Sequence, residues 1–349
     1  MPIVAPEKTT KVLVSGSNGY IAIWVVNNLL QKGYAVRGTV RSEDKGTHLK
    51  KIFADYGDKF ELAVVPDIVK EGAFDEAVQG VDAIEHTASP FHFKAKEPQE
   101  LIDPAVKGTL GILESALKYG SGVRRIVITS SCAAVAMTGT TPKICTEQDW
   151  NDEAVDIVEK EGSKASSAFM YRASKTLAER AAWGFYEKHK SSLNWDLVVL
   201  NPPLVLGPVM HEVSAPSSLN TSMADFYNTV ILGTKAPELL LTGLCWVDVR
   251  DLAEAHVLAL VKEGVQGERI IVSAGPYVWQ DWMDCANSLS PSPIPSHPNL
   301  PKGLPGSAKD VTHMVLFSAD KGEKLLGIKY HTMEEMTRDS LKDFEQRGW

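Results

Sequence analysis

The chain has few cysteines, and none of them forms a Cys-x-x-Cys pair. Its four cysteines are far apart in the 349-residue sequence, which favours free thiols in a reducing compartment over a disulfide framework. They are Cys132, Cys145, Cys245 and Cys285. No group of Cys and His residues has the spacing of a metal site, so we expect no bound metal.

The chain also lacks long apolar runs and an excess of positive charge. The apolar run from Ile21 to Val26 is far shorter than the ~20 residues of a membrane-spanning helix. The first ten residues contain two prolines and no apolar core, unlike a signal peptide. The net charge is −8, from 36 basic and 44 acidic residues, which argues against a nucleic-acid partner. We therefore expect a cytoplasmic protein that binds neither membranes nor nucleic acid.

What the sequence does contain is an alternation of short apolar segments and helical segments. Patterns typical of strands occupy residues 11–15, 34–40, 60–65, 81–86, 125–129, 195–200 and 269–272. Patterns typical of helices occupy residues 21–31, 99–119, 171–182 and 248–261, and we expect further helices between 318 and 348. This alternation predicts an α/β fold of the Rossmann type, which is a doubly wound parallel sheet with helices on both faces.

The regular alternation of strand and helix patterns ends after Asn201. Residues 202–245 are rich in Pro, Ser and Gly, and 288–306 has the composition of a connecting loop. We expect a nucleotide-binding domain formed by residues 1–205, to which the chain returns at about 245–273. Residues 206–349 are then mainly a smaller C-terminal substrate-binding lobe.

A glycine turn between the first strand and the first helix is the candidate phosphate site. Its pattern is G-x-x-G-x-x-A, with Gly16, Gly19 and Ala22 at the small positions. Gly16 permits a tight turn, Gly19 lets backbone N–H groups approach a pyrophosphate, and Ala22 allows close packing of helix on strand. Glycines are common in turns, so the motif gains weight mainly from its place between strand and helix.

The end of the second strand bears on which dinucleotide is bound. An NAD site usually has an acidic residue there for the ribose 2′-hydroxyl. Here Arg41 takes that place, where its guanidinium can pair with a 2′-phosphate, and Lys45 is placed to assist. This favours NADPH, although Arg41 as an ordinary surface residue is the alternative, and the acids Glu43 and Asp44 follow closely.

Asp67 and Ile68 follow the third strand, where the chain should pass an adenine ring. Asp67 could accept a hydrogen bond from the adenine amine and Ile68 could pack on the ring. An alternative of equal weight is that Asp67 is the N-cap of a helix that follows.

The pair Tyr171 and Lys175 is the sharpest catalytic signal. A spacing of four residues puts both side chains on one helix face. The pKa of a free tyrosine is near ~10, and we expect the Lys175 ammonium to lower it toward the range useful for acid–base catalysis. Alone, this spacing is common by chance and more often marks a solvated helix face.

A hydroxyl partner for this pair is expected just past the end of the fifth strand. Open α/β sheets bind ligands at that edge, and a serine there can orient a substrate carbonyl. Both Ser130 and Ser131 are candidates, and we take Ser131 as the catalytic one. The alternative is that both serines only cap the strand end.

Together these features resemble the extended short-chain dehydrogenase/reductase family. Within it the chain is most similar to the dihydroflavonol-reductase-like branch and its fungal NADPH-dependent methylglyoxal and ketone reductases. The resemblance covers nearly the whole chain. Its marks are VSGSNGYIA (14–22), RGTVRS (37–42), VPDI (65–68), HTASPF (86–91), ITSSCAAV (128–135), YRASK (171–175), LNPPLVLGP (200–208), LNTS (219–222) and WVDVRDLAEAH (246–256).

The resemblance implies hydride transfer of the 4-pro-S hydrogen from NADPH to a ketone or aldehyde, with Ser131, Tyr171 and Lys175 as catalytic residues. It implies that the cofactor is lined by Gly16, Ser17, Asn18, Gly19, Tyr20, Ile21, Arg41, Lys45, Asp67, Ile68, Thr87, Ala88, Ser89, Tyr171, Lys175, Pro202, Val205 and Ser222.

Two parts of the family pattern are less informative here. Many relatives have Asn in an N-V-x-G-T sequence, whereas this chain has Ala105 at that place, which puts a fourth catalytic residue in doubt. Apolar residues that could line a substrate pocket are for each position more safely interpreted as core; they are Phe91, Phe93, Met137, Phe169, Leu204 and Phe226.

Two other functions are compatible with the same predicted fold. A nucleotide-sugar epimerase of the same fold would hold NAD and have an acid where Arg41 stands. A catalytically silent NADPH-binding protein would typically lack the Tyr171/Lys175 pair. His86, His256 and the acidic residues of 246–251 are interpreted as structural. We expect a monomer or a homodimer.

Overall fold

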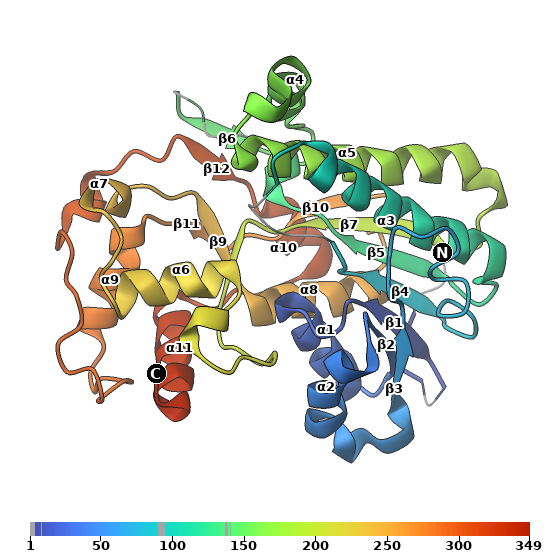
Figure 1. Ribbon diagram of the computed structural model, residues 1–349, viewed down its shortest axis with the longest axis horizontal. Coiled ribbons are helices and arrows are strands. Elements are labelled where there is room, and N and C mark those ends of the chain that lie inside the picture. The colour runs from blue at the N-terminus through green and yellow to red at the C-terminus, as the bar shows by residue number, and fades with distance from the viewer. Residues whose placement is uncertain (1–3, 8, 90–94, 137–138, 140) are drawn as a thin grey trace.

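The computed structural model describes residues 4–7, 9–89, 95–136, 139 and 141–349. Phe91, Phe93 and Met137, which we considered as pocket walls, lie outside the described residues. Figure 1 shows the arrangement, with the N-terminal sheet on one side and a helical C-terminal region on the other.

Seven parallel strands form the main sheet of the described residues, in the order β3-β2-β1-β4-β5-β7-β10. They are β1 (Lys11–Ser15), β2 (Ala35–Val40), β3 (Phe60–Val64), β4 (Ala83–His86), β5 (Arg125–Thr129), β7 (Asp196–Asn201) and β10 (Arg269–Ile271). This is a Rossmann-type doubly wound sheet, so the predicted fold class is confirmed.

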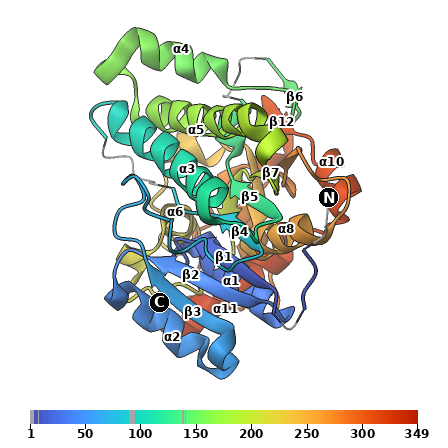
Figure 2. The same ribbon diagram turned by 90° about the vertical axis from the view of Figure 1, so that its right-hand side faces the viewer.

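Helices cover both faces of that sheet (Figure 2), with α1 and α8 on one face and α3 and α5 on the other. The helices of the described residues are α1 (Tyr20–Gln31), α2 (Thr47–Ile52), α3 (Gln99–Tyr119), α4 (Asp152–Glu161), α5 (Ser167–His189), α6 (Thr221–Val230), α7 (Pro237–Leu240), α8 (Val249–Val261), α9 (Trp279–Ser288), α10 (Asp320–Leu326) and α11 (Met333–Arg347). Successive residues of β1 show why both faces are covered. Val12 and Val14 are buried in a cluster with α1 and α8, whereas Leu13 is buried in a cluster with α3 and α5.

Short 3₁₀ turns and two small sheets complete the described structure. The turns are η1 (Glu43–Gly46), η2 (Ala54–Lys59), η3 (Cys132–Ala134), η4 (Gly162–Lys164), η5 (Lys190–Ser192), η6 (Pro216–Ser218) and η7 (Ser307–Asp310). One small sheet has β8 (Leu204–Leu206), β9 (Cys245–Asp248) and β11 (Gly275–Pro276), and the other pairs β6 (Lys143–Cys145) with β12 (Val315–Phe317). The sequence patterns predicted neither sheet.

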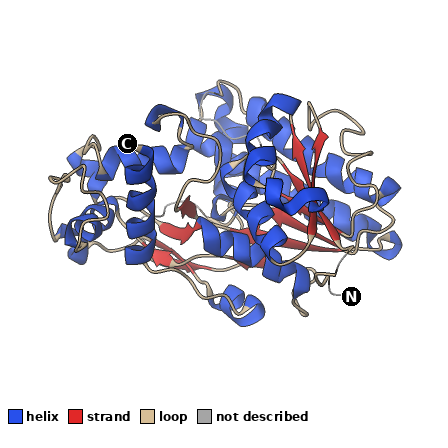
Figure 3. Ribbon diagram, turned by 90° about the horizontal axis from the view of Figure 1, so that it is seen from below, coloured by secondary structure: helices blue, strands red, loops and turns tan. Residues whose placement is uncertain are grey.

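The C-terminal region is built on aromatic packing. Phe226 of α6 meets Trp282 of α9 edge to face, with 5.9 Å between ring centres, and lies 6.4 Å from the ring of Phe344 of α11. Phe226 is fully buried there, so it is a core residue as we favoured. Figure 3 shows helices and loops predominating at this end of the molecule, away from the fan of main-sheet strands.

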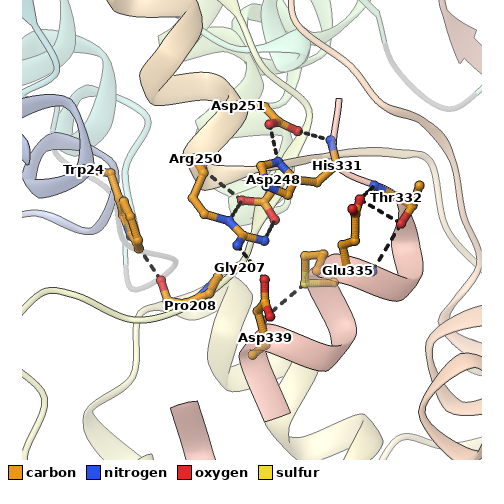
Figure 4. Close-up of polar contacts among 12 residues, drawn as sticks. Trp24, Gly207, Pro208, Asp248, Arg250, Asp251, His331, Thr332, Glu335 and Asp339 are labelled. Atoms are coloured by element: carbon orange, nitrogen blue, oxygen red, sulfur yellow. Dashed lines mark hydrogen bonds and ion pairs between the residues drawn. The ribbon is translucent and has the colours of Figure 1, made fainter. Parts of the chain in front are cut away.

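Polar contacts join the two parts of the molecule around the start of α8 (Figure 4). Asp248 caps α8 by accepting from the Arg250 N–H at 2.8 Å, and the Arg250 guanidinium bridges Asp248 at 2.7 Å and Asp339 of α11 at 2.6 Å. From the other side, Trp24 of α1 donates its indole N–H to the Pro208 carbonyl at 3.1 Å. The structural interpretation of residues 246–251 is confirmed.

The described residues contain neither a membrane-spanning helix nor a cluster of metal-ligating side chains. None of their helices is both long enough and apolar enough to cross a bilayer. Within the same residues, no three or more His, Cys, Asp and Glu side chains gather as a metal site. The thiols of Cys132, Cys145 and Cys245 are free and buried, and that of Cys285 is free and partly buried.

Candidate active site

The glycine turn after β1 and the loop after β4 face each other where the strand order reverses. Gly16 has a φ of +64°, and its carbonyl accepts from the Gly19 N–H at 2.9 Å, which closes the turn. A Cβ at Gly16 would lie 3.2 Å from the Cβ of Ala88, so the two segments approach closely. Open α/β folds bind dinucleotides at this point, with the phosphates at the start of the first helix, here α1.

Two predicted cofactor residues have side chains committed to the protein itself. The Ser17 hydroxyl and N–H both donate to the Thr39 carbonyl, at 3.0 and 2.9 Å, and fasten the turn to β2. The Tyr20 hydroxyl is buried and donates to the Gly207 carbonyl at 2.9 Å, toward the C-terminal region. Any cofactor contact from these two positions would therefore come through the backbone.

Arg41 follows β2 and is exposed, as is Lys45 within η1. Neither takes part in an ion pair within the residues that the structure describes, so both cations are available to a phosphate. The neighbouring acid Asp44 accepts a hydrogen bond from the Ser42 hydroxyl, which is the largest of the effects that hold its pKa below the ordinary value.

The predicted residues after β3 are at the surface of the same edge. Asp67 is exposed, and its carboxylate accepts from the Val69 N–H at 3.0 Å, as a cap of the turn that follows. Ile68 rests on α3 at Gly108, where a Cβ would lie 3.0 Å from the Ile68 Cδ1. Their contacts with an adenine ring stay a prediction.

The loop after β4 is held by Ser15. Its Oγ accepts from the N–H groups of both Thr87 and Ala88 at 3.0 Å each, and lies 3.0 Å from Nδ1 of His86. Because the two N–H groups occupy the oxygen lone pairs, the Ser15 hydroxyl donates to His86, whose proton is then on Nε2. Burial lowers the pKa of His86 to about 3, so this histidine is a neutral part of the scaffold.

The predicted residues after β7 are placed by backbone carbonyls. The Pro202 carbonyl accepts from the Cys132 N–H at 2.9 Å, which ties this segment to the one that carries Ser131. The Ser222 hydroxyl donates to the Val205 carbonyl at 2.6 Å and accepts from the Asn220 amide at 2.9 Å.

Helix α5 brings the reacting pair to the carboxyl edge of the sheet. Ser166 caps the helix by accepting from the Phe169 N–H at 3.4 Å, and Tyr171 and Lys175 follow on one face. The Lys175 ammonium lies 5.8 Å from the centre of the Tyr171 ring. Tyr171 forms a side-chain hydrogen bond with Ser131, which follows β5.

The structure distinguishes the two candidate serines. The Ser130 hydroxyl points to the other side and donates to the buried carboxylate of Glu179 at 2.6 Å. Ser131 instead contacts Tyr171, and its Oγ accepts from the Ala133 N–H at 3.0 Å. Of the two serines, therefore, only Ser131 has its hydroxyl beside the phenol of Tyr171.

The expected lowering of the Tyr171 pKa by Lys175 was wrong. Burial raises the pKa of Tyr171 to about 12, against smaller lowering effects of the Ser131 hydrogen bond and the Arg172 charge. The Lys175 ammonium donates to the Ser89 hydroxyl at 2.9 Å, and burial lowers the pKa of Lys175 to about 8. Both shifts have one cause, since burial opposes the charged form of either group. At neutral pH the phenol is protonated and can give a proton.

Two residues that hold this cluster, Glu179 and Asn201, were not predicted, and the contact of a third, Ser89, was not foreseen. Ser89 was expected beside the cofactor, but nothing indicated that it would receive Lys175. Glu179 follows Lys175 by four residues and so shares its helix face, which was an available signal. Asn201 ends β7 at the same sheet edge as Ser131.

Comparison with known proteins gives consistent matches over the whole chain. The model of the family described as "NAD dependent epimerase/dehydratase family" matches residues 12–273. The ketoreductase azaE of Aspergillus niger is 36% identical over 352 residues, which cover 95% of this chain and 96% of the relative. The NADPH-dependent methylglyoxal reductase GRE2 of Saccharomyces cerevisiae is 38% identical over 343 residues, which cover 94% and 96%.

A solved structure is similar over the same extent. The crystal structure of yeast methylglyoxal/isovaleraldehyde reductase Gre2 complexed with NADPH has a TM-score of 0.84 at 35% identity and covers 97% of this chain and 99% of its own.

Proposed function

The chain belongs to the NAD dependent epimerase/dehydratase family, and we propose that within it this chain is an NADPH-dependent reductase that converts ketones and aldehydes to alcohols, with Tyr171 as the proton donor. One observation carries the proposal: the Ser131 hydroxyl lies beside the Tyr171 phenol at the carboxyl edge of the sheet, close enough to lower the pKa of the phenol, and Lys175 is on the same helix face. The similar proteins named as ketoreductase and NADPH-dependent reductases support the same chemistry.

The residues at the switch point fit a dinucleotide with a 2′-phosphate. Gly16 and Ala88 approach closely beside the start of α1, which only small residues allow, and Arg41 stands exposed after the end of β2. We propose that the cofactor is held by the backbone of residues 16–21, by Arg41 and Lys45 at the phosphate and by Asp67 and Ile68 at the adenine. The remaining proposed contacts are Thr87, Ala88, Ser89, Tyr171, Lys175, Pro202, Val205 and Ser222.

NADPH supplies a hydride to the carbonyl carbon when it is bound. The hydroxyls of Ser131 and Tyr171 orient the carbonyl oxygen and stabilise the negative charge that develops on it. Tyr171 then transfers its proton to that oxygen, which completes the alcohol and leaves a phenolate. The Lys175 ammonium stabilises this phenolate, so the high pKa of the resting phenol suits a group that must begin protonated.

The two alternative functions fit less well. An epimerase that holds NAD would have an acid where Arg41 stands. A silent NADPH-binding protein would not need Ser131, Tyr171 and Lys175 brought together.

The wider setting is proposed from the same features. Residues 1–205 with about 245–273 would form the cofactor domain, and 206–349 would mainly form the substrate lobe. The substrate would be a small carbonyl compound, and the protein would act in the cytoplasm as a monomer or a homodimer.

The test is NADPH oxidation with a panel of ketones and aldehydes, for the wild type and Tyr171→Phe. Phenylalanine keeps the ring and removes the proton donor, so kcat should fall about 100-fold or more, since general acid catalysis contributes roughly 10²–10⁴-fold. The dissociation constant for NADPH, measured by fluorescence, is the control and should change little. Comparable oxidation rates for the two proteins would rule out Tyr171 as the donor.

The cofactor preference is tested by Arg41→Ala. The variant should raise KM for NADPH about 10- to 100-fold, as expected for the loss of a charge-assisted hydrogen bond to a phosphate, and leave KM for NADH unchanged. An equal rise for both cofactors would contradict the role of Arg41.

A further inference from the structure

The buried carboxylate of Glu179 lies on the catalytic helix but outside the reacting pair. Glu179 is only 2% exposed and receives hydrogen bonds from three other parts of the fold and from its own helix. Its Oε2 accepts from the Ser130 hydroxyl at 2.6 Å and from the Asn201 amide at 2.8 Å. Its Oε1 accepts from the Arg269 Nε at 2.5 Å and from the Trp183 indole at 3.3 Å. The lone pairs of this carboxylate are thus fully used.

These contacts surround the segment that carries Ser131. Ser130 precedes it, and the same Asn201 amide nitrogen that donates to Glu179 also donates to the backbone carbonyl of Ser131, at 3.1 Å. On its other side, the segment continues the pairing with the end of β7, since the Ser130 N–H donates to the Leu200 carbonyl at 2.8 Å.

We propose that Glu179, through Ser130 and Asn201, is a positioning residue that sets where Tyr171 of α5 stands relative to Ser131. This inference rests on the proposed function, because it concerns how the same two hydroxyls are brought to one carbonyl oxygen. Ser131 and Tyr171 come from different elements, and Glu179 joins those elements through charge-assisted hydrogen bonds, which are short and directional.

The distance between Glu179 and Tyr171 along α5 makes the position of Tyr171 sensitive to how Glu179 is held. Glu179 follows Tyr171 by eight residues, which is about 12 Å along a helix axis. If Glu179 is the anchor about which the helix turns, a tilt of α5 by about 5° would move Tyr171 by about 1 Å over that length. A misplacement of about 1 Å can cost up to about 100-fold in rate, because reacting atoms must lie in contact and in line.

Arg269 holds this carboxylate in place. Its guanidinium bonds Glu179, donates to the carbonyls of Glu147 and Asp149 at 2.6 and 2.9 Å, and lies 3.7 Å from the centre of the Trp150 ring. The anchor is therefore tied to the edge strand β10 and to the segment before α4, neither of which takes part in the proposed reaction.

The test compares two serine variants that make the same chemical change. Ser130→Ala removes the hydroxyl that donates to Glu179 and leaves Glu179, Asn201 and Arg269 paired. Ser115→Ala is the matched control: Ser115 lies on α3, is 1% exposed and donates to the Asp75 carboxylate at 2.7 Å. Both variants remove one buried hydrogen bond to a carboxylate, so both should lower the melting temperature by similar amounts.

The kinetic results should differ between the two variants. We expect Ser130→Ala to lower kcat about tenfold with an unchanged dissociation constant for NADPH, and Ser115→Ala to keep kcat within twofold of the wild type. A Ser130→Ala kcat within twofold of the wild type would overturn the positioning role. An equal loss of kcat in both variants would overturn it too, since the effect would then be one of stability alone.

A second variant separates lost contact from lost volume. Ser130→Cys keeps nearly the same size but has a much weaker donor, so its kcat should also fall, by somewhat less than that of Ser130→Ala. A wild-type rate in this variant would show that filling the space is enough and would overturn the hydrogen-bond anchor. By contrast, the proposed function itself would be overturned if the wild-type protein oxidised NADPH with none of the ketones and aldehydes of the panel.

Discussion

Two polar clusters lie one helical turn apart on α5 and differ in the charge of the side chains that meet them. The carboxylate of Glu179 accepts from Ser130, Asn201, Trp183 and the cation Arg269. The hydroxyls of Ser131 and Ser89, which meet Tyr171 and Lys175, are neutral.

The difference has a chemical consequence. Opposite charges offset the burial of these two groups only in part, through Arg172 for Tyr171 and Glu179 for Lys175, so burial still raises one pKa to about 12 and lowers the other to about 8. A carboxylate paired with a cation and saturated with hydrogen bonds stabilises the fold, whereas buried groups with strongly shifted pKa values cost stability and keep their protons available for a reaction. Variants in the two clusters should therefore affect different properties.

The largest effect is expected from breaking the saturated cluster with Arg269→Met. This change leaves the buried Glu179 without its counter-ion and should lower the free energy of unfolding by about 3–5 kcal/mol, measured by urea denaturation. The double variant Arg269→Met/Glu179→Gln removes both charges and should recover part of that loss. A single variant as stable as the wild type would show that the ion pair does not stabilise the fold.

Ser131→Ala should affect the rate far more than the fold. It removes one of the two hydroxyls proposed to face the carbonyl oxygen, so kcat should fall about 10²–10³-fold, as for other donors to a developing oxyanion. Stability should change by only about 1 kcal/mol, because the side chain also caps η3 by accepting from the Ala133 N–H. Circular dichroism melting and steady-state kinetics check the two parts. A large loss of stability with little loss of rate would contradict the contrast between the clusters.

Lys175→Met should change stability less than Arg269→Met does, and in the opposite direction. Burial lowers the pKa of Lys175 from 10.5 to about 8, so the charged form is disfavoured in the folded state. That cost is fully present below pH 8 and disappears as pH rises from about 8 to 10.5, because the folded protein loses the proton before the unfolded chain does.

The Met variant should therefore be more stable than the wild type at pH 7, by about 1–2 kcal/mol, although it should lose activity. The advantage should shrink toward zero near pH 10.5. Melting curves of both proteins between pH 6 and 10.5 measure this difference. A pH-independent difference would mean that the charge of Lys175 is not its cause.

Local patterns predicted much of the main fold. The expected strands at 11–15 and 125–129 and the helix at 99–119 coincide with β1, β5 and α3. Each has a clear apolar period and a turn residue or cap at its end, so neighbouring residues are sufficient to define it. The glycine turn and the shared helix face of Tyr171 and Lys175 were predictable for the same reason.

The small sheets were not predictable in this way. Their strands have two to four residues, too few for a period to show. The pairing of β6 with β12 joins Lys143 to Val315, and no local pattern specifies a partner so distant in the sequence. The helices between 202 and 245 were missed because the Pro, Ser and Gly residues there suggested loops.

The sequence by itself determined the order of the elements, the spacing of Tyr171 and Lys175 and the place of two serines at a strand end, because each depends on residues close along the chain. Only the tertiary structure decided that Ser131 contacts Tyr171 while Ser130 contacts Glu179. It also decided that the Tyr171 pKa rises instead of falling. Both outcomes depend on burial and on contacts across tens of residues, which the packing of α5 against the carboxyl edge of the sheet creates and which no local pattern contains.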